Sequence, residues 1–215
     1  MSVIVITGAN RGIGLALCTQ LATDHEIHAL CRTPSAELEA LGVQIHANVD
    51  VCDPHSIPVN QLPNIDILIN NAGILHRDSL DALDTGSILE QFTVNALGPL
   101  CVTQALLPKL SAGSKVAIVT SRMGSVTDNT SGGMYGYRMS KAAVNMAGMS
   151  LAHDLKRFGI SVALLHPGFV RTDMTGGKGY ISPSEAAHGL IAQIMRMTND
   201  NTGSFWHSNG EELPW

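Results

Sequence analysis

The sequence predicts an α/β fold in which seven strands form one open, mainly parallel sheet with helices on both faces. Short apolar runs rich in β-branched residues alternate with longer segments of helical periodicity, which is typical of a doubly wound sheet. Most of the short runs are bounded by Gly, Pro, Asn or Asp, which favour turns. No repeat, low-complexity tract or shift in composition divides the 215 residues, so we expect one domain, 1–215.

The strands and helices are expected from their periodicity, in chain order. The apolar runs expected to form strands are Val3–Thr7, Glu26–Cys31, Val43–Asn48, Ile65–Asn70, Lys115–Thr120, Ser161–His166 and Gly203–His207. The segments expected to form helices are Gly12–Thr23, Ser35–Leu41, Gly86–Leu110, Tyr135–Phe158 and Ser182–Met197. Pro99 and Pro108 lie inside the third helical segment. Because proline removes a backbone donor, we expect that helix to kink or to end early.

Composition excludes several functions. The net charge is −5 and no Lys/Arg run exceeds two residues, so the chain offers no electrostatic surface for nucleic acid or an anionic membrane. The longest apolar runs fall far short of the roughly 18 to 20 residues that cross a bilayer. The N-terminus shows no basic leader, so a cytoplasmic location is expected. Neither the four cysteines nor the nine histidines have the spacing of a metal site, and no metal is expected.

A glycine-rich turn follows the first expected strand and opens into the first expected helix. It consists of Thr7, Gly8, Ala9, Asn10, Arg11, Gly12, Ile13 and Gly14. Glycine lets the backbone turn tightly and approach a ligand, and unpaired N–H groups at a helix start attract an anion. In this context the turn favours a dinucleotide pyrophosphate and a Rossmann-type strand order, 3-2-1-4-5-6-7. The alternative is an ordinary structural turn.

Positive charge replaces an expected acid at the end of the second strand. NAD-binding proteins usually place Asp or Glu there to bind the ribose 2′-hydroxyl, whereas this chain has Cys31-Arg32. Arg32 and Arg11 could clamp a 2′-phosphate, which favours NADP(H) over NAD(H), or both could be plain surface residues. Asp50, after the third expected strand, could accept a hydrogen bond from the adenine amino group or cap the following turn.

Tyr137 and Lys141 are four residues apart and therefore share one face of the expected helix. A nearby ammonium group stabilises phenolate and lowers the tyrosine pKa, so that the hydroxyl can exchange a proton with a carbonyl or alcohol oxygen. The alternative is a helix-surface pair without chemistry. Tyr135 is a poor substitute for Tyr137, because Met139 is the residue four positions further on.

Other polar residues are expected at the carboxyl edge of the sheet, where open α/β folds bind ligands. Ser121 follows the fifth strand and could orient a substrate carbonyl, and Asn70-Asn71-Ala72-Gly73 ends the fourth. Asn95 has poor helix propensity for its mid-helix position, which suggests either a bound water that relays protons or a kink near Pro99. His166 could contact ligand or be a hydrogen-bonded strand-end residue.

These motifs together resemble the short-chain dehydrogenase/reductase family, and they follow the family order over most of the chain. The residues that carry the resemblance are Thr7–Gly14, Asn70–Gly73, Asn95, Ser121, Tyr137, Lys141 and His166–Gly168. Residues 132–143 and 210–215 resemble the branch that contains C-factor and sniffer-type carbonyl reductases. Two departures stand out: a long interval between Ser121 and Tyr137, and a short segment between the second and fourth strands.

The resemblance implies a role for each matching residue. Tyr137 would be the general acid/base, Lys141 would tune it and bind the nicotinamide ribose, Ser121 would hold the carbonyl, and Asn95 would complete a proton relay. Further cofactor contacts are implied at Val51, Asn71, Ala72, Gly73, Pro167, Gly168, Val170 and Thr172. Glycines in the loop Thr172–Tyr180 would allow it to close over a small substrate.

The expected function is therefore hydride transfer between NADP(H) and the carbonyl of a small aldehyde, ketone or quinone. The alternative is a C-factor-like signalling or sensing protein that binds NAD(P) with incidental turnover. The resemblance also implies a homodimer or homotetramer formed by the two long helices.

Overall fold

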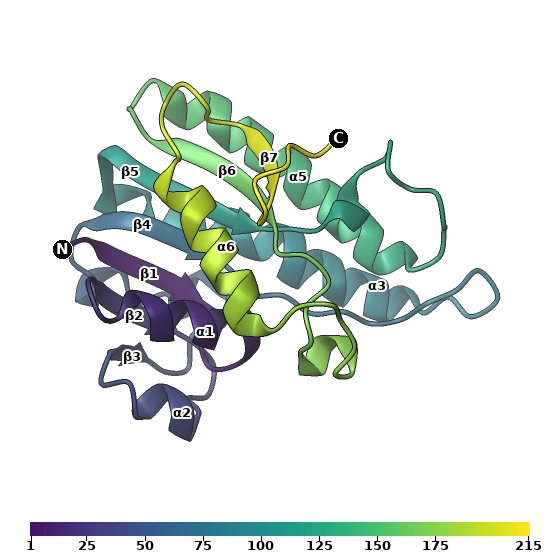
Figure 1. The fold of residues 1–215 in the computed structure, drawn as a ribbon, viewed down its shortest axis with the longest axis horizontal. Coiled ribbons are helices and arrows are strands. Elements are labelled where there is room, and N and C mark those ends of the chain that lie inside the picture. The colour runs from purple at the N-terminus through teal and green to yellow at the C-terminus, as the bar shows by residue number, and fades with distance from the viewer.

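The computed structural model describes residues 1–215, and its seven strands form one parallel sheet in the predicted order (Figure 1). The strands are β1 (Val3–Thr7), β2 (Glu26–Leu30), β3 (Gln44–His46), β4 (Ile65–Asn70), β5 (Leu110–Val119), β6 (Ser161–His166) and β7 (Ser204–His207). The helices are α1 (Gly12–Leu21), α2 (Ala36–Glu39), α3 (Thr85–Phe92), α4 (Gly98–Leu106), α5 (Tyr135–Lys156) and α6 (Pro183–Met195). The predicted Rossmann-type fold is confirmed.

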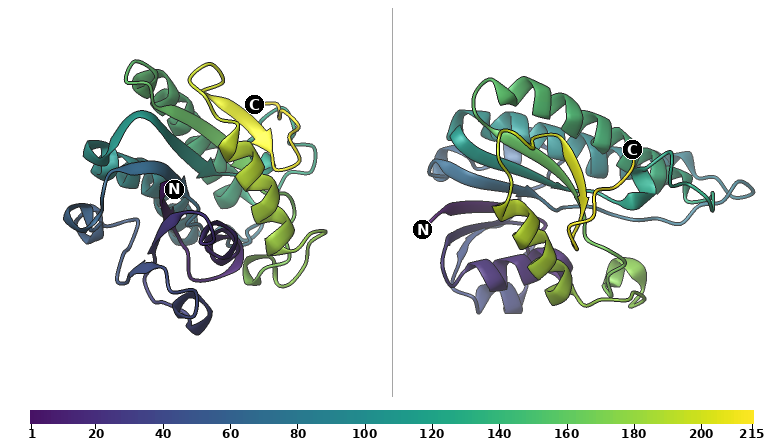
Figure 2. Two further views of the ribbon diagram at one scale, coloured as in Figure 1. Left: turned by 60° about the vertical axis from the view of Figure 1, so that its left-hand side comes forward. Right: turned by 45° about the horizontal axis from the view of Figure 1, so that its top comes forward.

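Helices cover both faces of the sheet, as Figures 1 and 2 show. Leu17 of α1 and Leu190 of α6 belong to one apolar layer, and Val102 of α4 and Val144 of α5 belong to the other. Neighbouring residues of a strand point into opposite layers, so both faces of the central strands are buried. This explains why these strands appear in the sequence as continuous apolar runs. None of the helices combines the length and the apolar character needed to cross a membrane.

The third predicted helix is interrupted at the place where proline predicts a break. A π-helical turn, η3 (Thr93–Leu97), separates α3 from α4, and the Gly98 N–H donates to the Thr93 carbonyl five residues earlier. Pro99 lies in the first turn of α4, where its missing N–H removes no helical bond. Pro108 lies in the short turn η4 (Leu107–Lys109), so β5 begins at Leu110 rather than at the predicted Lys115.

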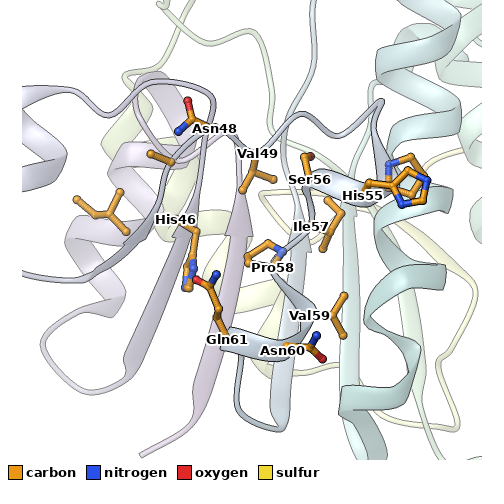
Figure 3. A pocket seen from close by; sticks show the side chains of 13 residues that line it. His46, Asn48, Val49, His55, Ser56, Ile57, Pro58, Val59, Asn60 and Gln61 are labelled. Carbon is orange, nitrogen blue, oxygen red and sulfur yellow. The ribbon is translucent and has the colours of Figure 1, made fainter.

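The connection between β3 and β4 contains no long helix, only two short turns, η1 (Pro54–Ser56) and η2 (Val59–Gln61). The sheet face is thinly covered there, and an open cavity of about 620 Å³ lies between residues 45–49 and 54–61. Figure 3 shows His46 and Gln61 together on its wall. His46 is hydrogen-bonded to His28 at 3.0 Å, and His28 to Glu26 at 3.0 Å. Neither Tyr137 nor Ser121 lines this cavity, so it is separate from the site described next.

Candidate active site

Parallel strands bring several of the predicted residues to one edge of the sheet. The arrowheads of β1, β4, β5 and β6 point the same way in Figure 1, and the segments that follow them hold the glycine turn, Asn71–Gly73, Ser121 and Pro167–Gly168. The carboxyl edge of such a sheet is the usual ligand-binding edge.

The glycine turn is held against the end of β4. Thr7 Oγ1 accepts hydrogen bonds from the N–H groups of Asn71 and Ala72, at 3.0 and 3.1 Å. The Asn71 amide donates back to the carbonyls of Thr7 and Gly8, at 3.0 and 3.2 Å. A Cβ atom at Gly8 would come within 2.8 Å of the Ala72 Cα, and φ at Gly8 is +64°. Backbone proximity and a left-handed conformation therefore both require glycine at this position.

The N-terminus of α1 offers free backbone donors beside this turn. The residue before α1, Arg11, makes no capping hydrogen bond through its side chain. A Cβ atom at Gly14 would lie 2.2 Å from the Gly8 carbonyl oxygen, so the helix can start this close to the turn only because Gly14 has no side chain. Unpaired N–H groups at a helix start attract an anionic group.

The two arginines predicted to bind a 2′-phosphate are both exposed. Arg11 forms an ion pair with Asp173, with 3.6 Å between the Nη1 and Oδ2 atoms. Arg32 lies close enough to Cys52, near Asp50, for its positive charge to oppose the rise in the pKa of the Cys52 thiol. Asp50 Oδ1 accepts from the Cys52 N–H at 2.9 Å, so one oxygen of that carboxylate caps its own turn. The predicted capping role of Asp50 is thus observed.

Tyr137 and Lys141 are both buried on one face of α5, with 8% and 5% of their surfaces exposed. The Lys141 Nζ lies 5.7 Å from the centre of the Tyr137 ring and donates to the Val119 carbonyl at 3.0 Å. A solvated pair on the helix surface, the alternative interpretation, is therefore wrong. Ser121 Oγ accepts from the Met123 N–H at 3.1 Å and lies close enough to Tyr137 to influence its pKa.

The pKa values of this pair differ from the expectation. Burial raises the pKa of Tyr137 to about 12, with Ser121 acting in the opposite direction through a hydrogen bond. Burial also lowers the pKa of Lys141 to about 8. The expected lowering of the tyrosine pKa by Lys141 is not found among the chain's own groups, because desolvation dominates for both side chains.

The long interval between Ser121 and Tyr137 is accommodated by a close approach of backbones. The turn η5 (Arg122–Gly124) packs on α5 at Lys141, where a Cβ atom on Gly124 would lie 2.6 Å from the Lys141 carbonyl carbon. Arg122 then binds Asp128 at 2.6 Å within the loop and Glu211 at 3.4 Å in the C-terminal segment. The extra residues thus extend away from the site while Ser121 stays beside Tyr137.

Asn95 lies in the π-helical turn and is 1% exposed. Its Oδ1 accepts from the Ile74 N–H at 2.8 Å, and its Nδ2 donates to the Ile74 carbonyl at 2.9 Å and to Ser140 Oγ at 3.0 Å. A Cβ atom on Gly73 would touch both Asn95 Oδ1 and Lys141 Nζ, at 3.2 and 3.8 Å. Asn95 therefore lies at an irregular turn of the helix near Pro99. Both N–H groups of the Asn95 side chain donate to protein acceptors, and Oδ1 accepts one hydrogen bond. One lone pair of Oδ1 therefore stays available for a water molecule.

The remaining predicted cofactor contacts lie after β3, beside α4, and after β6. Val51 packs against Gly98, where an added Cβ atom would lie 3.0 Å from a Val51 methyl group. Thr172 lies next to Gly12 of the glycine turn, 3.5 Å from the position of a Cβ atom there. Gly168 has a φ of +93°, and Val170 bridges to Ile181. The loop that starts at Thr172 therefore reaches back to the glycine turn.

His166 is not the hydrogen-bonded strand-end residue that one interpretation of the sequence predicted. Its Nδ1 is buried without a hydrogen-bond partner, and its ring packs edge-to-face on His207 with 4.9 Å between ring centres. Burial, and then the charges of His207, Arg122 and Lys141, lower the pKa of His166 to about 3.

Sequence reasoning missed Asp78, Gln91 and Ser140. Asp78 binds the first two N–H groups of α5, Gln91 binds the His76 N–H, and Ser140 joins Asn95 to the Tyr137 carbonyl. No local pattern marks Asp78, because its partners are 57 and 58 residues away. No group of three or more His, Cys, Asp or Glu side chains is arranged to hold a metal ion.

Comparison with known proteins places this geometry in a family. The family model described as short chain dehydrogenase matches residues 2–179. The chain is 42% identical to 1-hydroxy-2-glutathionyl-2-methyl-3-butene dehydrogenase of Rhodococcus sp. (strain AD45), with all of both chains covered. It is 46% identical to C-signal of Myxococcus xanthus over 70% of this chain and 93% of that one.

The chain is also similar in structure to solved carbonyl reductases. The carbonyl reductase Sniffer of D. melanogaster has a TM-score of 0.92 and 27% identity, with all of both chains covered. A carbonyl reductase from Pseudomonas aeruginosa PAO1 in complex with NADP has a TM-score of 0.88 and 33% identity, also over the full length of both chains. The chain belongs to the short-chain dehydrogenase family of oxidoreductases.

Proposed function

We propose that this protein uses NADPH to reduce the carbonyl group of a small aldehyde, ketone or quinone, and that it oxidises the alcohol in the reverse direction. The observation that carries the proposal is the burial of Tyr137 and Lys141 beside Ser121, at the carboxyl edge of the sheet. Burial of ionisable groups is unfavourable for folding, so such a cluster at a ligand-binding edge favours a chemical role.

The residues present fit a dinucleotide. Gly8 and Gly14 leave a cradle that side chains would fill, and the uncapped start of α1 supplies donors for the pyrophosphate together with Thr7, Asn10 and Ile13. Asp50, Val51, Asn71, Ala72 and Gly73 would hold the adenosine side. Tyr137, Lys141, Pro167, Gly168, Val170 and Thr172 would hold the nicotinamide side. When bound, the cofactor supplies the hydride that the carbonyl carbon receives.

The chain's own residues supply the proton. Ser121 and Tyr137 would hold the carbonyl oxygen between their hydroxyl groups. With a pKa of about 12, Tyr137 keeps its proton at neutral pH and is ready to donate it to the oxygen as the hydride arrives. Lys141, with a pKa near 8, would return a proton to Tyr137, and Asn95 would orient the water that resupplies Lys141. Reduction uses the neutral Tyr137 phenol as a proton donor, and alcohol oxidation uses the phenolate as a proton acceptor.

The cofactor preference proposed here is for NADP(H). Arg11 and Arg32 would place two positive charges at the adenosine end, and the two residues directly after β2, Cys31 and Arg32, carry no carboxylate that could bind a ribose hydroxyl. To bind the 2′-phosphate, the Arg11 guanidinium must first break its ion pair with Asp173. Breaking this pair costs little, because exposed ion pairs are worth about 0 to 1 kcal/mol.

The proposed substrates are mainly apolar. Phe169 and Tyr180, at the two ends of the loop beside the site, pack edge-to-face with 5.5 Å between ring centres. Both are exposed, at 45% and 85%, and Met174 between them is 40% exposed. A glycine-containing loop that carries exposed aromatic and thioether groups suits a small apolar carbonyl compound better than a charged one.

We also infer a homodimer or homotetramer built on α3 and α5. These helices pack against each other and present exposed apolar side chains at Leu89, Met139 and Met146. Exposed apolar patches of this kind mark association surfaces.

The test is the loss of NADPH absorbance with a panel of aldehydes, ketones and quinones, run in parallel with NADH. Tyr137→Phe is expected to bind NADPH and to lose nearly all turnover. Tyr135→Phe, two residues away and 37% exposed, is the matched control and should retain wild-type turnover. Equal loss in both variants, or turnover that survives Tyr137→Phe, would refute the assignment of Tyr137.

Similarity to C-signal favours signalling as a second candidate function. Binding of both NADPH and NADH by the wild-type protein, with no turnover across the whole panel, would favour that candidate over carbonyl reduction.

A further inference from the structure

The helix that carries Tyr137 has no cap of its own. The residue that precedes α5, Met134, offers no side-chain oxygen and lies in the left-handed region with a φ of +54°, after Gly132 and Gly133 at +64° and +63°. A helix start leaves four backbone N–H groups without partners inside the helix, and Ser, Thr, Asp or Asn usually accepts from one of them. At α5 the chain immediately before the helix supplies no such group.

Asp78 supplies the missing cap from a distant loop. Its Oδ1 accepts from the Tyr135 N–H at 2.5 Å, and its Oδ2 accepts from the Gly136 N–H at 2.8 Å. Its backbone carbonyl also accepts from the Met134 N–H at 3.3 Å. A carboxylate at the positive end of a 22-residue helix is favourable in charge as well as in geometry.

The loop that carries Asp78 is itself anchored to α3 and η3. Asn95 binds both backbone groups of Ile74, and Gln91 Oε1 accepts from the His76 N–H at 2.9 Å. Figure 1 shows this loop running from β4 toward α3, past the start of α5. The hydrogen bonds to Ile74 and His76 therefore fix the position of the loop segment that leads to Asp78.

A second contact holds the first turn of α5 in place. Ser140 Oγ donates to the Tyr137 carbonyl at 2.8 Å and accepts from Asn95 Nδ2 at 3.0 Å. Asn95 thus holds the Asp78 loop through its hydrogen bonds to Ile74, and it holds the first turn of α5 through its hydrogen bond to Ser140. Tyr137 is the third residue of α5, one position after the last amide that Asp78 binds.

We infer that Asp78 is a positioning residue for Tyr137: its carboxylate sets where α5 begins and so where the Tyr137 hydroxyl lies relative to Ser121. The inference rests on the proposed acid/base role of Tyr137. Gly136 belongs to the same arrangement, because a Cβ atom there would lie 2.6 Å from Gln91 Nε2 and 3.0 Å from Asp78 Oδ2. Any side chain at position 136 would push the cap away from the helix.

The experiment compares Asp78→Asn with Asp81→Asn, a matched loss of one charge in the same loop. Asp81 is exposed and makes no hydrogen bond or ion pair. Asp78→Asn turns one oxygen acceptor into a donor that faces a backbone N–H. We expect kcat, counted per NADPH-binding molecule, to fall about tenfold, which corresponds to a rise of about 1.4 kcal/mol in the activation free energy when the Tyr137 hydroxyl is displaced. The KM for NADPH should change less than twofold, and Asp81→Asn should match wild type.

Hydrogen exchange gives a readout that does not depend on activity. In Asp78→Asn, the peptide that contains the Tyr135 and Gly136 amides should exchange faster than in wild type, while peptides from the glycine turn stay unchanged. Gly136→Ala should reproduce both effects, and the double variant should be little worse than either single one.

The outcomes separate this inference from the proposed function. Wild-type protein without carbonyl reduction would contradict the proposed function itself. Wild-type turnover with an unchanged kcat per NADPH-binding molecule in Asp78→Asn would overturn the positioning role alone, even if the melting temperature fell. Lower kcat with faster local exchange in Asp78→Asn, and neither effect in Asp81→Asn, would support it.

Discussion

The Lys141 ammonium group donates its hydrogen bond to the Val119 carbonyl, at 3.0 Å, across the space between α5 and β5. Val119 is the last residue of β5, two positions before Ser121. The same side chain therefore joins the helix that holds Tyr137 to the strand end that leads to Ser121. Lys141 therefore has a structural contact, to Val119, in addition to its proximity to the Tyr137 ring.

Replacing this buried lysine by methionine should trade activity for stability. Lys141→Met is expected to lower turnover at least a hundredfold while raising the melting temperature. Because burial lowers the pKa of Lys141 to about 8, the unfolded chain binds more protons than the folded one between pH 8 and 10.5. Wild-type stability should then rise with pH through this window, and Lys141→Met should lose that rise.

Thermal unfolding at pH 7 and pH 9.5 checks this prediction. The difference in free energy of unfolding between Lys141→Met and wild type should be largest at pH 7, where Lys141 is buried in its charged form. A pKa shift from 10.5 to about 8 corresponds to roughly 3 kcal/mol. Lys156→Met, on the exposed last turn of α5, is the control. A melting temperature that falls in Lys141→Met would show that the bond to Val119 outweighs desolvation.

Arg32 should control the choice between NADPH and NADH. Arg32→Asp removes a charge-assisted contact to a 2′-phosphate and introduces repulsion, so the ratio of kcat/KM for NADPH to that for NADH should fall by at least about tenfold. Arg157→Asp, at the exposed end of α5, should leave the ratio unchanged. An unaltered preference in Arg32→Asp would disprove the proposed phosphate contact.

Asp173 competes with a 2′-phosphate for Arg11. Asp173→Asn removes the 3.6 Å ion pair and leaves the Arg11 guanidinium free, so the Kd for NADPH should decrease two- to threefold while the Kd for NADH stays the same. The size follows from the worth of an exposed ion pair, about 0.2 to 1 kcal/mol. Salt should erase the difference, and titration at low and high ionic strength checks this. An equal effect on both cofactors would point to the loop rather than to Arg11.

Local rules accounted for most of the fold and for the centre of the site. Strand runs, the glycine turn and the Tyr137–Lys141 spacing depend on periods of two and of 3.6 residues, which the sequence displays directly. Pro99 predicted the break in the third helix for the same local reason. The burial of Tyr137 and Lys141 follows once α5 packs on the sheet.

Contacts between distant segments were beyond this reasoning. The Asp78 cap joins residues 57 positions apart, and Gly124 packs on Lys141 only because β5 and α5 become neighbours in the fold. The pKa of Tyr137 was expected in the wrong direction because sequence shows which charges are near but not how much water burial removes.

His166 is expected to make the free energy of unfolding sensitive to acid. Burial, with the positive fields of His207, Arg122 and Lys141, lowers its pKa to about 3, so the folded chain stays unprotonated there while the unfolded chain takes up a proton below about pH 6.5. The unfolded state then binds more protons, and the free energy of unfolding should fall as pH drops from 6.5 toward 3. The pKa of His207 is lowered as well, which adds in the same direction.

His166→Leu should remove part of this acid sensitivity. Urea unfolding at pH 7 and pH 5 is expected to show a smaller loss of stability in the variant than in wild type, because the leucine cannot gain a proton on unfolding and leaves no buried Nδ1 without a partner. His188→Leu is the control, since His188 is exposed on α6 and should leave the pH dependence unchanged. If His166→Leu loses as much stability as wild type between the two pH values, then groups other than His166 cause the acid sensitivity.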